Sequence, residues 1–217
     1  MNDFDKGPDR KTISEKDLFK KIILAPREAF RFINDYKYEK HLYILLFLAG
    51  IVRSFDRASS KNMGDNYSIW AIIAIGVIAG GLFGWISYYI YAALISWSGK
   101  WMNGKGNTES ILRILAYALF PSILSLIILI PHIAIYGNDI FKSENGFYSS
   151  GLVDSIIYYS FTFIEIIFGI WSVVLCVIGI SEVQKLSISK SILNLILPVI
   201  LVIFLMLILF LPFQLFN

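Results

Sequence analysis

Residues 99–107, GKWMNGKGN, come closest to a chemical motif in this sequence. Gly99 precedes Gly104-Lys105 as in the phosphate-binding loop G-x-x-x-x-G-K-[ST], but Gly106 stands where that loop needs Ser or Thr for magnesium. The loop also needs a preceding strand, whereas here the preceding residues form a long apolar run rich in Tyr and Trp. We therefore interpret the glycines as ending a helix and turning the chain, because glycine accepts positive φ.

Glu165 is the carboxylate placed deepest in an apolar stretch, FTFIEIIFGIW. A carboxylate in lipid is costly and marks a candidate functional site. One interpretation is a polar cavity that handles a proton, a cation or a lipid headgroup and is lined by Glu165, Ser87, Ser122 and Ser125. The other is a neutral carboxyl group that hydrogen-bonds to a serine, tyrosine or backbone carbonyl and locks the helices together. We expect His132 to lie nearer the outer end of its helix, as a single histidine without a nearby carboxylate.

Catalytic motifs of the common hydrolases are missing from the sequence. It contains neither G-x-S-x-G nor H-E-x-x-H, and its two histidines lie far apart. A single cysteine excludes an intrachain disulfide. The basic residues are dispersed or flank apolar runs, which does not favour nucleic-acid binding. We predict a protein that is not an enzyme, without cofactor, metal or nucleic-acid partner.

The elements that carry these residues are long apolar runs. Of the 217 residues, 57% are hydrophobic and 16% charged, which is typical of an integral membrane protein. A spanning helix needs about 20 mostly apolar residues. Five runs stand out: 41–52, 68–97, 111–136, 155–180 and 192–213. The predicted fold is an all-α bundle of five transmembrane helices, with four spans and a re-entrant first run as the alternative.

Basic residues predict the orientation of these spans. Most of the 19 Lys and Arg lie in the N-terminal segment and in the second and fourth connections. Cytoplasmic flanks of membrane helices are enriched in these residues. We therefore predict a cytoplasmic N-terminus, a cytoplasmic 99–107 turn and a C-terminus outside.

The N-terminal segment is divided into a disordered tail, 1–13, and an amphipathic juxtamembrane segment, 14–37, before the membrane domain, 38–217. Ser14 is expected to start one helix and Pro26 a second. Apolar residues recur at three- and four-residue spacing, which predicts a helix lying on the bilayer with its basic residues near lipid. The alternative is that the apolar stripe packs under the bundle. The basic residues of the interfacial interpretation are Lys20, Lys21, Arg27 and Arg31.

Three glycines four residues apart, Gly76, Gly80 and Gly84, predict close helix packing in the second run. Packing within the bundle is favoured over a homo-oligomer interface. At the end of that run, the turn Gly99, Lys100, Gly104, Lys105 and Gly106 is expected to bring its lysines to lipid phosphates.

Capping residues follow the turn. Asn107 or Thr108 should cap the third span, with Glu109 in its first turn. In the fourth connection, residues 181–191, Glu182 and Lys185 are expected to pair with Lys100 or Lys105 and with Glu109. One interpretation is that the 99–107 turn and residues 181–191 together form a docking surface. The simpler one is that residues 181–191 form a solvated loop.

Three segments together resemble the Yip family of Ypt/Rab-interacting membrane proteins: LAPREAF at 24–30, SWSGKWMNGKGNTESILRILAYALFP at 96–121, and GISEVQKLSISKSILNLILP at 179–198. The resemblance implies a five-span helical bundle with a cytoplasmic N-terminus. The short N-terminal arm is similar to that of prokaryotic members, which implies the bacterial inner membrane and does not carry over Rab binding.

The resemblance implies a non-enzymatic protein that organises membrane or recruits partners through its cytoplasmic arm and loops. The alternative from the residues is a small transporter, channel or lipid-handling protein that uses a polar cavity around Glu165. The two differ in one observable: a transporter needs a polar cavity that reaches one face, whereas a scaffold should be packed and dry there.

Overall fold

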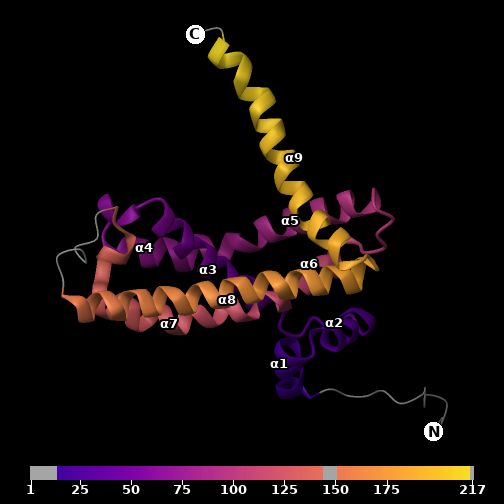
Figure 1. Cartoon of the computed structure of the whole chain (residues 1–217), viewed down its shortest axis with the longest axis horizontal. Coiled ribbons are helices and arrows are strands. Elements are labelled where there is room, and N and C mark those ends of the chain that lie inside the picture. Colours follow the sequence, from indigo (N-terminus) through magenta and orange to yellow (C-terminus); the bar gives the residue numbers. More distant parts are fainter. Residues whose placement is uncertain (1–13, 144–150, 216–217) are drawn as a thin grey trace.

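The computed structural model describes residues 14–143 and 151–215, and over these residues every regular element is helical (Figure 1). The predicted disordered tail, 1–13, lies outside the described residues. The elements are α1 (Glu15–Leu24), α2 (Pro26–Asp35), α3 (Leu42–Ser60), η1 (Met63–Asp65), α4 (Ile69–Ile75), η2 (Gly76–Gly81), α5 (Leu82–Lys100), α6 (Thr108–Ala118), α7 (Phe120–Tyr136), η3 (Gly137–Phe141), α8 (Leu152–Gln184) and α9 (Ile188–Leu215).

Within the described chain, four helical stretches are long and apolar enough to cross a membrane: Ile69–Lys100, Thr108–Phe141, Leu152–Gln184 and Ile188–Ile208. They correspond to the second to fifth apolar runs. The first run forms α3, which has 19 residues and lies outside this set. Its second half carries Arg53, Asp56 and Arg57, and these charges lower its hydropathy below that of the other four.

The helices do not form an evenly closed bundle. Figure 1 shows α7 and α8 side by side along the long axis, with α3, α4 and α5 on one side of them. In contrast, α9 starts beside the ends of α5 and α8 and then leaves the other helices at a steep inclination. Polar contacts hold its base: the Tyr91 hydroxyl donates to the Leu195 carbonyl at 2.7 Å.

Glycines let α3 approach η2 and α5. A Cβ on Gly84 would lie 2.5 Å from the Gly50 Cα, and one on Gly80 would lie 2.7 Å from the Gly50 carbonyl oxygen. A Cβ on Gly76 would meet the Phe55 ring at 2.9 Å. All three glycines thus lie against α3 of the same chain. Gly76 and Gly80 belong to η2, a π-helical turn, which is a widening of the helix that often occurs at functional sites.

The N-terminal arm, α1 and α2, docks under the bundle. Ser14 caps α1 and Pro26 begins α2, as predicted. The apolar stripe is buried in the main core together with residues of α6 and α8; its members include Leu18, Ile22, Ala29, Phe30 and Ile33. The stripe is therefore not free to enter lipid, and interfacial contact by this arm stays a prediction that rests on its basic side chains.

Candidate functional site

A cavity of about 340 Å³ lies among α3, α7 and α8. Both α3 and α8 pack along α7, but they make little contact with each other, so α7 forms the floor between them. Each helix contributes three polar residues: Asp56, Ser59 and Ser60 from α3, Ser122, Ser125 and His132 from α7, and Tyr158, Thr162 and Glu165 from α8. The residues from α3 are exposed, whereas His132 is buried, so the cavity runs from an exposed rim into the helix packing.

His132 and Glu165 form the central pair of this cavity. The His132 Nδ1 lies 3.6 Å from the Glu165 Oε1, with side chains 5% and 30% exposed. Neither His132 nitrogen has a hydrogen-bond partner, and neither does the Glu165 Oε1. Aromatic rings surround the imidazole, with that of Tyr158 at 5.0 Å and that of Phe161 at 5.2 Å between centroids. Buried polar groups are normally hydrogen-bonded, so these three atoms are an exception in the helix packing.

The expectation that His132 has no nearby carboxylate is wrong. Because α7 and α8 run antiparallel, residues near the C-terminal end of α7 meet residues well inside α8. One signal in the sequence could have indicated the contact between His132 and Glu165. Ser122, Ser125 and His132 repeat at spacings that keep them on one face of a helix, and Thr162 lies on the face of Glu165.

Two of the predicted serines line the cavity and one does not. The backbone N–H and the hydroxyl of Ser122 each lie 2.9 Å from the Ser172 hydroxyl, and the Ser125 hydroxyl donates to the Ser122 carbonyl at 2.6 Å. Ser87, on α5, is not among the cavity residues. Asp56 joins the site instead; sequence reasoning missed it because the first apolar run ends at Val52.

The chemistry of the cavity is acidic. It holds two carboxylates, and among the described residues that line it none is Lys or Arg. Over the described residues there is also no cluster of three or more His, Cys, Asp or Glu suited to a metal ion. The arrangement can accept hydrogen bonds from a cation or a neutral donor and would repel an anion.

The glycine-rich turn encloses a glutamine side chain. A Cβ on Gly99 would lie 2.2 Å from the Gln184 Nε2, and one on Gly104 would lie 2.5 Å from its Oε1. The backbone N–H of Gly106 donates to that Oε1 at 2.8 Å. The one left-handed residue of the turn is Asn103, with φ of 64°. The predicted reason for the glycines, positive φ, is therefore wrong: these positions lack side chains because Gln184 occupies the space.

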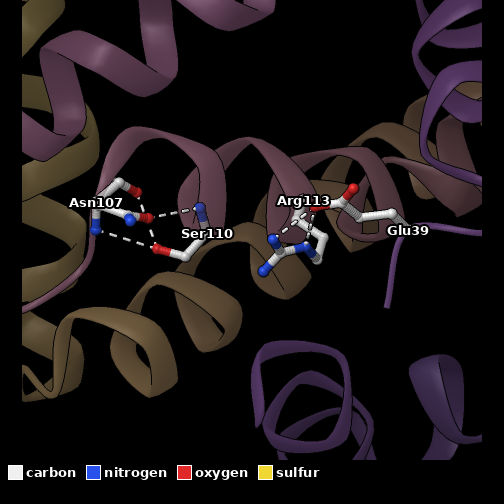
Figure 2. Close-up of polar contacts among 4 residues, drawn as sticks. All are labelled: Glu39, Asn107, Ser110 and Arg113. Carbon is white, nitrogen blue, oxygen red and sulfur yellow. Dashed lines mark hydrogen bonds and ion pairs between the residues drawn. The ribbon is translucent and has the colours of Figure 1, made fainter. Parts of the chain in front are cut away.

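Residues that follow the turn cap and anchor α6 (Figure 2). The Asn107 Oδ1 accepts from the Ser110 N–H at 2.9 Å, and the Ser110 hydroxyl accepts from the Asn107 N–H at 3.1 Å, which confirms Asn107 as the cap. Further along α6, the Arg113 Nη2 donates to the Glu39 Oε1 at 2.7 Å. The guanidinium is 5% exposed, so this ion pair joins the start of α3 to the core. Sequence reasoning did not single out Arg113, although a charged residue within an apolar run is itself a signal, as it was for Glu165.

Glu182 pairs with the arm and not with the turn. Its carboxylate lies 3.5 Å from Arg31, 4.0 Å from Arg27 and 3.9 Å from Lys185. The expected pairs with Lys100 or Lys105 are wrong, because α2 docks beside the end of α8. Four other basic residues were predicted to lie near lipid: Lys21 pairs with Glu28 at 2.5 Å, and Lys20, Lys100 and Lys105 are exposed.

In the part of the chain that it describes, the structure combines a helical core with four apolar helices that are long enough to cross a membrane. These features define the class of the protein, which is that of integral membrane proteins. The family model described as the Yip1 domain matches residues 20–210 of this chain. The chain therefore belongs to the Yip family. Comparison with curated proteins and with solved structures gave no significant match.

Proposed function

We propose that this Yip-family protein binds a small polar ligand inside the membrane and acts as a transporter, channel or lipid-handling protein. One observation carries the proposal: a cavity of about 340 Å³ that reaches from exposed Asp56 to the unpartnered pair of His132 and Glu165. A scaffold would be expected to be packed and dry at this depth. Small-molecule pockets have volumes of about 300–1,000 Å³, so the cavity is large enough for a ligand of a few atoms beyond a bare ion.

The proposed topology has α3 as a fifth span, the N-terminus in the cytoplasm and the C-terminus outside, in a bacterial inner membrane. The distribution of Lys and Arg supports this orientation. The cavity is lined by the end of α3 and by η3, so it would open toward the outer side. At 19 residues α3 is about 28 Å long, close to the hydrocarbon thickness, and its charged residues would lie in its outer half.

Cysteine accessibility tests the proposal. The single Cys176 is replaced by alanine, and Ser125→Cys is compared in liposomes with Ile127→Cys, a control on the exposed apolar face of the same helix. A small water-soluble methanethiosulfonate should label the cavity cysteine at least ten times faster. Equal, slow labelling at both positions in the folded protein would show that the cavity is dry, and the proposal would then be abandoned.

Partner recruitment at the cytoplasmic face is the second candidate function. It is favoured by the docked arm, in which Arg27 and Arg31 share Glu182 while their side chains stay 61% and 63% exposed. We propose that these side chains, with Lys20, form a basic surface for an acidic partner or anionic lipid. Cross-linking in cells should lose a specific product in the Arg27→Ala/Arg31→Ala variant, and unchanged products would argue against it.

Lysines of the turn, Lys100 and Lys105, are proposed to contact lipid phosphates at the same end of the molecule. Both are exposed, and such residues contribute about 1 kcal/mol each near an anionic surface. ATP binding that Lys105→Ala abolishes would contradict this and would revive the nucleotide interpretation.

A further inference from the structure

We propose that the cavity among α3, α7 and α8 selects an ammonium group, carried by an amine-bearing lipid headgroup or by a small soluble amine. The proposal rests on the function proposed above and specifies its ligand. It depends on the charge of the cavity, on the unpartnered acceptors inside it, and on its aromatic wall.

The charge of the cavity favours a cation. Asp56 and Glu165 both line it, and among the described residues neither carboxylate has a Lys or Arg within ion-pair distance. The nearest basic side chains in the sequence, Arg53 and Arg57, are on α3 itself, and the Arg53 guanidinium lies over the Tyr88 ring at 5.7 Å. Glu165 lies inside the cavity, where a charged group is stable when it is paired, so its compensating charge comes from a ligand cation or from a proton on His132 or on the carboxyl group itself.

The free acceptors of the cavity match an N–H donor. The Glu165 Oε1 and both nitrogens of the buried His132 lack hydrogen-bond partners, and a neutral imidazole keeps one acceptor nitrogen. A primary ammonium carries three N–H donors and no acceptor. It could donate to Glu165, to His132 and to a hydroxyl such as that of Thr162, which lies one helical turn from Glu165 and also lines the cavity.

The aromatic wall and the volume favour an organic cation over a metal ion. Phe55 and Phe141 are buried, lie 6.1 Å apart between ring centroids, and line the cavity together with Tyr158. Aromatic faces attract ammonium groups and do not ligate metals. The described residues also offer no three-ligand cluster for a metal, and about 340 Å³ exceeds the space that one ion needs.

The position of the cavity favours a lipid as the source of the ammonium group. Because α3 and α8 scarcely touch, the cavity adjoins the gap between two membrane helices. Exposed apolar side chains of α8, Ile166 and Ile170, provide a surface on which acyl chains could lie. Phosphatidylethanolamine has both features: a primary ammonium and two acyl chains.

Native mass spectrometry of the purified full-length protein tests the preference. The probes are phosphatidylethanolamine, phosphatidylcholine, which has no ammonium N–H, and anionic phosphatidylglycerol. We expect phosphatidylethanolamine to be retained at least tenfold over phosphatidylglycerol, with phosphatidylcholine between them. Glu165→Gln and the cavity-filling Gly169→Leu should remove the preference, and Asp56→Asn, at the exposed rim, should weaken it about threefold. The surface variant Glu109→Gln should leave it unchanged.

A second measurement separates the two sources and the two proposals. If no lipid is preferred, but ethylamine slows labelling of Ser125→Cys and Glu165→Gln abolishes this protection, the ligand is a soluble amine. Labelling of Ser125→Cys without amine protection or lipid preference overturns the ammonium proposal and leaves the cavity as a site for another ligand. Preference for phosphatidylglycerol, or a preference for phosphatidylethanolamine that folded Glu165→Gln and Asp56→Asn both retain, overturns it as well.

Discussion

A methyl group at Gly99 should disrupt the contact between the turn and α8. The Cβ of Gly99→Ala would lie 2.2 Å from the Gln184 Nε2, so the amide must move. In its present position that side chain accepts from the Gly106 N–H at 2.8 Å and donates to the Ile95 carbonyl and the Asn194 Oδ1, both at 3.2 Å. These three bonds are buried, so their loss is not compensated by water.

The expected magnitude follows from these bonds. Each buried hydrogen bond contributes about 1 kcal/mol net, which gives a loss of about 3 kcal/mol if all three break. Alanine in place of glycine within α5 would offset up to about 1 kcal/mol through helix propensity. We expect Gly99→Ala to lower the free energy of unfolding by about 2 kcal/mol, measured by SDS-induced unfolding in mixed micelles followed by circular dichroism.

A double-mutant cycle makes this reasoning refutable. Gln184→Ala removes the same three bonds and also the steric conflict, so adding Gly99→Ala to it should only bring the helix-propensity gain of up to about 1 kcal/mol. The coupling free energy between the two positions should therefore be about 3 kcal/mol. The control is Gly169→Ala on α8, where a new Cβ meets no atom within 4 Å, and it should not destabilise the protein. Additive effects within about 0.5 kcal/mol would refute the steric explanation of the glycines.

Four further predictions concern the N-terminal arm, the residues that follow it and the cap of α6, each measured by the same unfolding assay. Glu39→Gln keeps a neutral acceptor for a buried guanidinium and should cost about 1–2 kcal/mol, because a hydrogen bond to a charged group contributes about 1.5–3 kcal/mol and a neutral one about 1 kcal/mol; an unchanged midpoint would contradict it. Asn107→Ala removes the cap of α6 and should cost about 1 kcal/mol, with no such loss in Asn107→Ser. Lys37→Gly should gain up to about 1 kcal/mol, since Lys37 has φ of 47°, and a loss would show that its side chain matters more. Lys40 donates to Glu15 and lowers the pKa of that carboxyl group, so the contribution of the pair is complete above pH 4.5 and is lost as the pH falls through the lowered value; Glu15→Gln should flatten this acid response.

Local patterns in the sequence predicted the elements well and their partners less well. The apolar runs after residue 68, the starts of α1 and α2, and the cap at Asn107 all depend on residues a few positions apart. Ser122 and Ser125 were matched with Glu165 by depth alone, and the cavity contains all three. The same argument from depth also placed Ser87 in the cavity, which it does not line, because two residues at equal depth can face different neighbours.

Sequence by itself determined that this chain is a helical membrane protein of the Yip family and that Glu165 is a costly carboxylate to embed. These conclusions follow from composition, periodicity and a linear order of motifs. Only the tertiary structure decided that His132 meets Glu165, that Asp56 joins them, and that Gln184 fills the space left by the glycines. Each of these contacts joins residues on different helices, and their register depends on the packing of whole helix faces, which no short stretch of sequence encodes.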